Sequence, residues 1–85
     1  MSTDTHVISI FLNNEPERRM DLADGTTIRE AINAFYPDTE WRDNSIVVLN
    51  GKQGILEIEI DGQMTEDTYE LRRNQEIFLT HYWPS

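Results

Sequence analysis

The sequence has no cysteine and, among its 85 residues, a single lysine, Lys52. Without cysteine the chain cannot form a disulfide, bind a metal through a thiolate or use a thiol as a nucleophile. No apolar run approaches the roughly 18 residues that a membrane-spanning helix needs, and no basic and apolar leader opens the sequence. We therefore expect a soluble protein of a reducing compartment, namely the cytoplasm, without a membrane partner.

Basic residues are scarce as well: sixteen Asp and Glu face seven Lys and Arg, which gives a formal charge of −9. This charge would repel a phosphate backbone, so the composition argues against direct binding of nucleic acid. A basic protein partner would be attracted, and its binding would weaken as salt is raised. The same charge also serves solubility alone, and the sequence leaves both interpretations open.

The length predicts one domain over residues 1–85, with too small a core to enclose a large cofactor. Residues 1–5 are small and polar, which predicts a short flexible lead-in. Residues 6–12 alternate in the manner of a strand. One face carries Ile8, Ile10 and Leu12, and the other carries Val7, Ser9 and Phe11. A second strand over residues 18–22 completes a predicted antiparallel hairpin.

A helix is predicted over residues 27–36. Thr27 and Glu30 have the spacing of a capping box, in which each side chain bonds a free backbone donor of the first turn. An apolar stripe follows at Ile28, Ala31, Ile32 and Phe35. Pro37 disfavours helical geometry at Tyr36 and ends the helix there.

Three further strands are predicted in the second half, over residues 46–49, 56–60 and 76–80. Asn50-Gly51 and Asp61-Gly62 favour tight hairpin turns. Residues 65–74 are polar and indicate a short strand or a turn of helix, and residues 81–85 form an aromatic tail. The fold class expected is α+β, a mixed four- to five-stranded sheet packed on one helix.

Four segments carry a family resemblance: residues 24–32 (DGTTIREAI), 35–37 (FYP), 46–52 (IVVLNGK), and Leu71 followed by residues 76–79 (EIFL). Their order and spacing resemble the ubiquitin-like β-grasp superfamily, above all its sulfur-carrier branch, the small subunit of molybdopterin synthase and the thiamine-pathway carrier. The resemblance covers most of residues 18–79. It implies that the first and last strands are parallel neighbours and that the helix covers one face of the sheet.

The C-terminus departs from this family. Its carriers and modifiers end in a flexible Gly-Gly tail that is thin enough to enter the channel of an activating enzyme. Here the sequence ends in Trp83-Pro84-Ser85, where an indole and a proline should obstruct such a channel. The departure favours a non-enzymatic protein-interaction module. A prokaryotic ubiquitin-like modifier or sulfur carrier, joined at Ser85 by an activating or conjugating enzyme encoded nearby, remains an alternative.

Two groups of residues are candidate contacts for a protein partner. Val7, Phe11 and Phe78 would form an apolar patch on the open sheet face, through which relatives of ubiquitin bind their partners. His81, Tyr82 and Trp83 concentrate aromatic side chains in the tail, which could dock into a partner or a second copy of the chain. Alternatively, Phe11 and Phe78 are half-covered by their neighbours, and the tail folds back over its own sheet.

The sequence offers little that points to catalysis, a cofactor or a metal. His6 and His81 would lie at opposite ends of the sheet, and Glu57, Glu59 and Asp61 are explained more simply by a solvated strand face than by an acid/base pair. No nucleophile triad, phosphate-binding loop or metal-ligand spacing is present. Two other roles stay open: an acidic decoy for a nucleic-acid-binding protein and an accessory subunit of an enzyme complex.

Overall fold

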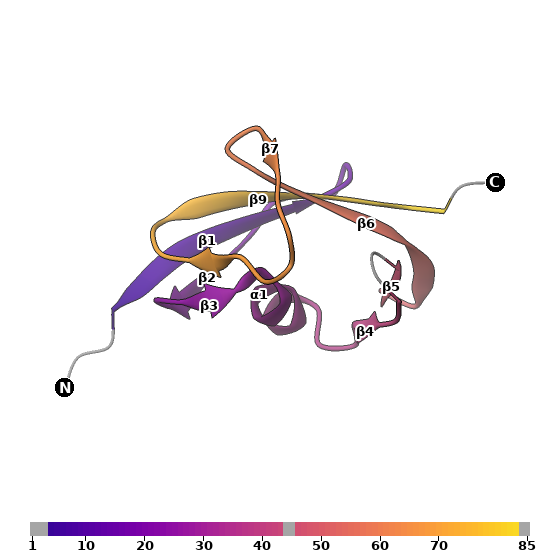
Figure 1. Ribbon diagram of the computed structural model, residues 1–85, viewed down its shortest axis with the longest axis horizontal. Coiled ribbons are helices and arrows are strands. Elements are labelled where there is room, and N and C mark those ends of the chain that lie inside the picture. Colours follow the sequence, from indigo (N-terminus) through magenta and orange to yellow (C-terminus); the bar gives the residue numbers. More distant parts are fainter. Residues whose placement is uncertain (1–3, 44–45, 84–85) are drawn as a thin grey trace.

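A curled mixed sheet packs one of its faces against a helix (Figure 1). The computed structural model describes residues 4–43 and 46–83. Its strands are β1 (Thr5–Leu12), β2 (Arg18–Ala23), β3 (Thr26–Thr27), β4 (Glu40–Trp41), β5 (Ile46–Leu49), β6 (Lys52–Ile60), β7 (Gln63–Met64), β8 (Glu70–Leu71) and β9 (Gln75–Tyr82), with helix α1 at Ile28–Phe35. The main sheet has the order β2-β1-β9-β6-β5-β4, and β7 pairs with β6.

The prediction of an α+β fold with one helix on a mixed sheet is confirmed, and the arrangement is compatible with a β-grasp-like fold. The sheet is larger than predicted: within the described residues it has seven strands instead of four to five, and β3 and β8 form a separate two-stranded sheet. The additional strands β3, β4, β7 and β8 are two residues long each. Such short strands show no alternation of polar and apolar residues that a sequence pattern could reveal.

The first and last strands pair in parallel, as the family resemblance implied. Ile10 lies opposite Ile77 and Phe11 lies opposite Phe78. On its other side β9 pairs antiparallel with β6, where Ile58 faces Leu79. Strand β9 is therefore a central strand of the sheet.

The predicted N-terminal hairpin is confirmed by the antiparallel pairing of β1 with β2. The flexible lead-in was predicted to run through residue 5, but residues 4 and 5 are already part of the structure. Thr5 pairs with Ala23, and the Asp4 carbonyl accepts a hydrogen bond of 2.9 Å from the Asp24 N–H. Residues 1–3 lie outside the described residues.

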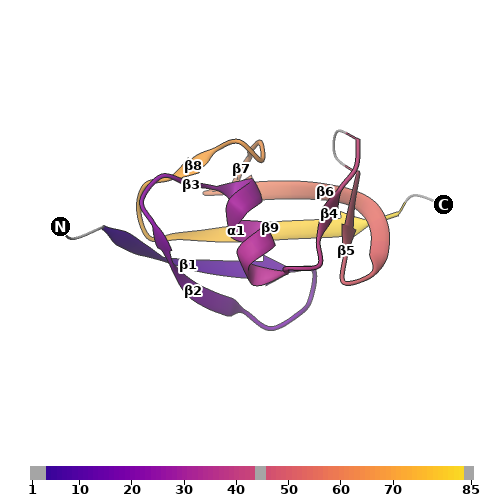
Figure 2. The ribbon, with the colours of Figure 1, turned by 90° about the horizontal axis from the view of Figure 1, so that it is seen from below.

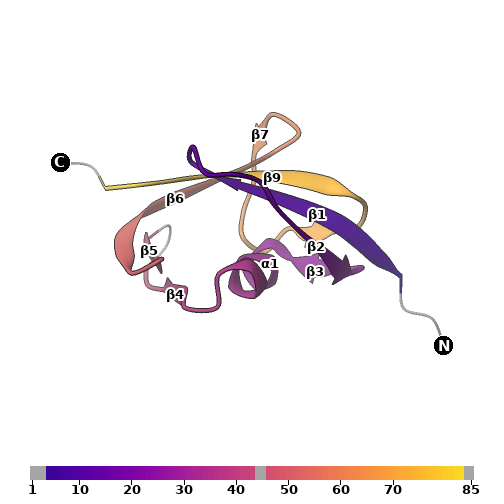
Figure 3. The ribbon, with the colours of Figure 1, turned by 180° about the vertical axis from the view of Figure 1, so that it is seen from behind.

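Helix α1 begins and ends where its capping residues predict. Thr27 is the N-cap: its side chain accepts the Glu30 N–H, and the Glu30 carboxylate accepts the Thr27 N–H. Tyr36 closes the last turn by donating its N–H to the Ile32 carbonyl. Figures 2 and 3 show α1 lying across one side of the sheet, with β3 leading into it and β8 beside β3.

The core lies between α1 and the inner face of the sheet. Its buried side chains come from α1, its C-cap and the strands around it: Ile8, Ile10, Leu12, Ile28, Ala31, Ile32, Phe35, Tyr36, Val47, Leu49, Leu56, Ile58, Ile60, Leu71, Ile77 and Leu79. Both predicted hairpin turns are confirmed, with positive φ at Asn50 (54°) and Gly51 (78°) and at Asp61 (54°) and Gly62 (79°). In the part of the chain that is described, no helix is long and apolar enough to cross a membrane.

Candidate interaction site

Two phenylalanines stack on the outer face of the sheet, the side away from α1. The rings of Phe11 on β1 and Phe78 on β9 have centroids 4.9 Å apart and planes inclined by 11°. The parallel register brings them together, because these two residues lie directly opposite each other. Phe78 is 43% exposed and Phe11 is half-buried. The predicted placement of both residues on the open face is therefore confirmed.

Val7 lies on the same face of β1 and is 40% exposed, but it does not join this stack. Ser9 lies between Val7 and Phe11 along β1, and the residue opposite Ser9 on β9 is Glu76. The expected continuous patch of Val7, Phe11 and Phe78 is thus divided by a polar pair. The cause is the register of β1 and β9, which places the charged Glu76 between Val7 and the stacked phenylalanines.

Carboxylates lie beside the stacked rings. Glu59 lies opposite Phe78 on β6, and Glu57 lies two residues before it on the same face. Glu57 accepts a hydrogen bond of 3.0 Å from the Tyr82 hydroxyl, which raises the pKa of Tyr82. On the β2 side, a hydrogen bond with Ser9 and the contacts with Arg19 lower the pKa of Glu17. The stack therefore has an acidic border on its β6 side, whereas Glu17 on the β2 side is paired with Arg19.

Two of the three aromatic residues predicted to lie in the C-terminal tail belong to the last strand instead. Strand β9 continues through His81 and Tyr82, which pair with Leu56 and Ile55 of β6. The predicted strand end at residue 80 is thus too early, and the predicted tail over residues 81–85 begins too soon. The reason is a close approach that only glycine permits: a Cβ at Gly54 would lie 2.7 Å from the Tyr82 carbonyl oxygen.

The three aromatic residues are not equally available to a partner. A ring nitrogen of His81 lies 2.9 Å from the Val47 carbonyl oxygen, and the Asn13 side chain bonds both the N–H and the carbonyl of His81. His81 is thus engaged within the sheet. Tyr82 and Trp83 are 41% and 57% exposed. Ser85, the attachment residue of the modifier alternative, lies outside the described residues.

The remaining polar candidates lie apart from one another. His6, at the start of β1, has its Nε2 atom 2.8 Å from the Asp24 Oδ1 atom, and the parallel register places it at the opposite end of the sheet from His81. Asp61, in the turn after β6, forms an ion pair with Arg73. Among the described residues, no three His, Asp or Glu side chains come close enough together to hold a metal ion.

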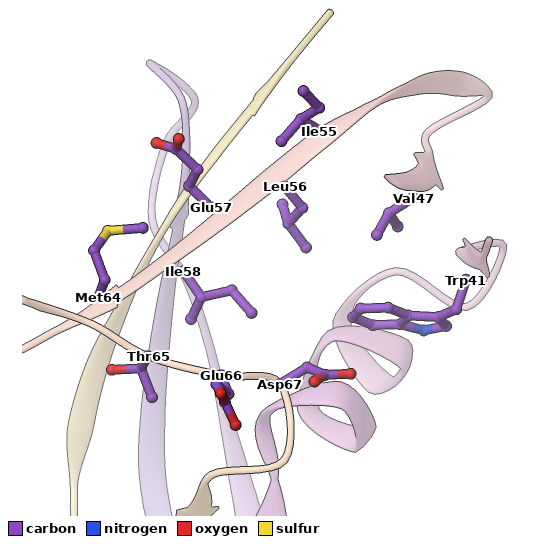
Figure 4. A pocket seen from close by; sticks show the side chains of 10 residues that line it. All are labelled: Trp41, Val47, Ile55, Leu56, Glu57, Ile58, Met64, Thr65, Glu66 and Asp67. Carbon is purple, nitrogen blue, oxygen red and sulfur yellow. The ribbon is translucent and has the colours of Figure 1, made fainter. Parts of the chain in front are cut away.

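A cleft on the helix side of β6 was not foreseen from the sequence. It has a volume of about 450 Å³ and lies between β6, the segment after β7, and Trp41 (Figure 4). It is lined by Trp41, Val47, Ile55, Leu56, Glu57, Ile58, Met64, Thr65, Glu66 and Asp67. One signal was available, because Trp41 is a large aromatic residue within an otherwise polar segment.

No protein-family model matches the chain, and neither a curated protein nor a solved structure is significantly similar to it. Membership of the ubiquitin-like superfamily accordingly stays a prediction.

Proposed function

We propose that the chain is a ubiquitin-like β-grasp protein of the cytoplasm that acts without catalysis, by binding a protein partner on the open sheet face. The exposed stack of Phe11 and Phe78 is the observation that carries this proposal. Tyr82, the last residue of β9, and Trp83 directly after it would extend the contact.

The stack has the features of an energetic centre of an interface. Aromatic residues dominate such centres, and a central aromatic side chain typically costs about 2 kcal/mol or more of binding free energy when it is cut back to alanine. The two rings already hold each other in place, so little side-chain entropy would be lost when a partner covers them. A rigid pair of this kind fits a shallow apolar pocket on the partner.

The acidic border selects the charge of the partner. Glu57 and Glu59 flank the stack on the β6 side, and Glu76 lies on the same face of β9. A partner with Lys and Arg around its apolar pocket would be attracted, whereas two copies of this chain meeting by this face would bring like charges together. The partner proposed is therefore a different, basic protein, and binding should weaken as salt rises.

The test compares proteins captured from the native host by three N-terminally tagged variants: the unmodified chain, Phe11→Ser/Phe78→Ser, and the control Met20→Ser. Met20 is also apolar and partly exposed, at 36%, but it belongs to the edge strand β2 and the other face of the sheet. We expect a partner that the unmodified chain and the control capture and that the double variant loses. Circular dichroism verifies that all three are folded.

Two results would overturn the proposal. Equal capture of the partner by the double variant would exclude the stack as the contact. Adducts that survive denaturation and are joined through the C-terminal residue would instead establish a covalent modifier.

A further inference from the structure

The cleft beside β6 lies at a gap in the strand pairing. Pairing of β5 with β6 reaches Ile55, and pairing of β7 with β6 starts at Glu59. Between these points, no strand within the described residues pairs with the outer edge of β6 at residues 56–58. The Thr65 N–H donates to the Ile58 carbonyl at 2.9 Å, which closes the gap at this end. Leu56, Ile58 and Thr65 all line the cleft.

The cleft has an apolar wall. Leu56 and Ile58 point from β6 toward Trp41 and Asp67, whereas Ile55 and Glu57 point to the other side of the strand (Figure 4). Val47 of the neighbouring β5 completes the wall, and all three aliphatic side chains belong to the hydrophobic core. A side chain entering the cleft would therefore contact the core directly.

Trp41 is a fixed part of this site. Its Nε1–H donates a hydrogen bond of 2.8 Å to Asn33 Oδ1 on α1. The Arg29 guanidinium lies over its ring, 4.7 Å from the centroid. The cation–π contact with Arg29 and the hydrogen bond to Asn33 together hold the indole in position, without the need for a ligand.

The cleft carries negative charge. Glu66 and Asp67 line it on the side to which Leu56 and Ile58 point. Arg29 lies 3.6 Å from Asp67 and over the Trp41 ring, so its charge is already engaged by these two groups. A ligand with positive charges beside an apolar group would match this distribution.

We propose that the cleft binds an extended peptide segment of a partner protein, with an apolar side chain seated against Leu56, Ile58 and Trp41 and with Lys or Arg residues beside it. Addition of a strand to an exposed sheet edge is a common mode of peptide recognition. The gap of three β6 residues accommodates about 10 Å of extended chain. This site is separate from the stacked phenylalanines and does not depend on the function proposed for them.

The probe is the capped peptide acetyl-Lys-Val-Leu-Val-Lys-amide, added to the ¹⁵N-labelled full chain and followed by NMR. The matched control acetyl-Glu-Val-Leu-Val-Glu-amide has the same apolar centre with reversed charge. We expect the basic peptide, at millimolar concentration, to shift the backbone amides of residues 56–58 and 65–67 and the indole signal of Trp41, and the acidic peptide to leave them unchanged.

Two charge-reversed variants sharpen the test. Glu66→Lys places a cation at the cleft, and Glu15→Lys makes the same change in the exposed turn between β1 and β2. Since a single exposed charge contact contributes at most about 1 kcal/mol, we expect the basic peptide to bind Glu66→Lys about fivefold more weakly. Its affinity for Glu15→Lys should be unchanged within about twofold, which the screening of distant charges allows.

The proposal is overturned by any of three results. The first is an absence of shifts at millimolar basic peptide, and the second is an equal response to the acidic peptide. The third is a set of shifts centred on Phe11 and Phe78, which would assign the peptide to the open sheet face. Loss of partner capture in the Phe11→Ser/Phe78→Ser variant has no bearing on this outcome, so the two proposals fail independently.

Discussion

Two neighbouring residue pairs on the same two strands differ in burial. Ile10 and Ile77 face each other across β1 and β9 and are fully buried, whereas the next pair, Phe11 and Phe78, lies on the outer face and keeps Phe78 43% exposed. Both pairs are apolar, so hydrophobicity does not distinguish them. The inner pair is covered by the core around α1, and no element of the described chain covers the outer pair. We infer that the inner face provides stability and the outer face is free to bind.

The largest effect is expected on the inner face. Ile10→Ala should reduce the free energy of unfolding by about 2–5 kcal/mol, because it leaves a cavity in a fully packed site. Urea denaturation followed by circular dichroism measures this loss. If the variant does not fold, Ile10→Val, with an expected loss of about 0.5–1.5 kcal/mol, provides the measurement. The amount of partner captured per folded molecule should be unchanged. If a folded variant captured less partner, the inner face would contribute to binding as well as to stability.

The next effect is expected where the strands approach too closely for a side chain. Gly54→Ala should cost about 1–3 kcal/mol of the free energy of unfolding, since its Cβ would lie 2.7 Å from the Tyr82 carbonyl oxygen. Hydrogen exchange should also become faster at the amides of residues 81 and 82. Gly51→Ala tests instead the positive φ of 78° in a turn whose surroundings are open. If exchange at residues 81 and 82 rises equally in both variants, the close approach is not what holds this end of β9.

The stacked pair should contribute modestly to stability. A double-mutant cycle with Phe11→Ala and Phe78→Ala should give a coupling free energy of about 0.5–1.5 kcal/mol, the range of aromatic pairs. Chemical denaturation of the four proteins measures it. A coupling as large as the loss caused by Ile10→Ala would show that the outer face is a second core, and the contrast between the two pairs would then disappear.

The smallest effect is expected from an exposed network at the edge of the sheet. The hydrogen bond from His6 and then that from Arg72 lower the pKa of Asp24 below its usual value of 3.8. A lowered carboxyl pKa stabilises the fold when the group is ionised. This contribution is present above the unfolded pKa and is lost as the pH falls through the lower folded value.

Thermal melts from about pH 5 downward should therefore show a smaller loss of stability for Asp24→Asn than for the unmodified chain. Asp38→Asn, an exposed carboxylate outside this network, provides the control. Identical pH profiles for Asp24→Asn and the unmodified chain would contradict the role of the network.

The sequence revealed those features that depend on neighbouring residues. The capping box at Thr27 and Glu30, the hairpin of β1 and β2 and the turns at residues 50–51 and 61–62 all rest on local backbone preferences. The placement of Phe11 and Phe78 on one face followed from strand alternation and the parallel pairing that the family resemblance implied.

Features that depend on distant pairing were missed. The extension of β9 through Tyr82 requires Gly54, which is 28 positions earlier in the chain. The division of Val7 from the stack depends on the residue of β9 that lies opposite Ser9. The cleft at Trp41 arises where the pairings of β5 and β7 leave part of the β6 edge uncovered. None of these relations leaves a periodic pattern in the sequence.

The central position of β9 also has a consequence for how the chain folds. Strands β1 and β6 are each paired with β9, so the sheet cannot close until residues 75–82 have been synthesised. Contacts that join distant parts of a chain slow folding, since the entropy of closing the intervening loop is lost before the contacts form. We expect the apolar faces of β1 and α1 to remain uncovered during synthesis until β9 is available, so the pairing of β9 commits this domain to its fold.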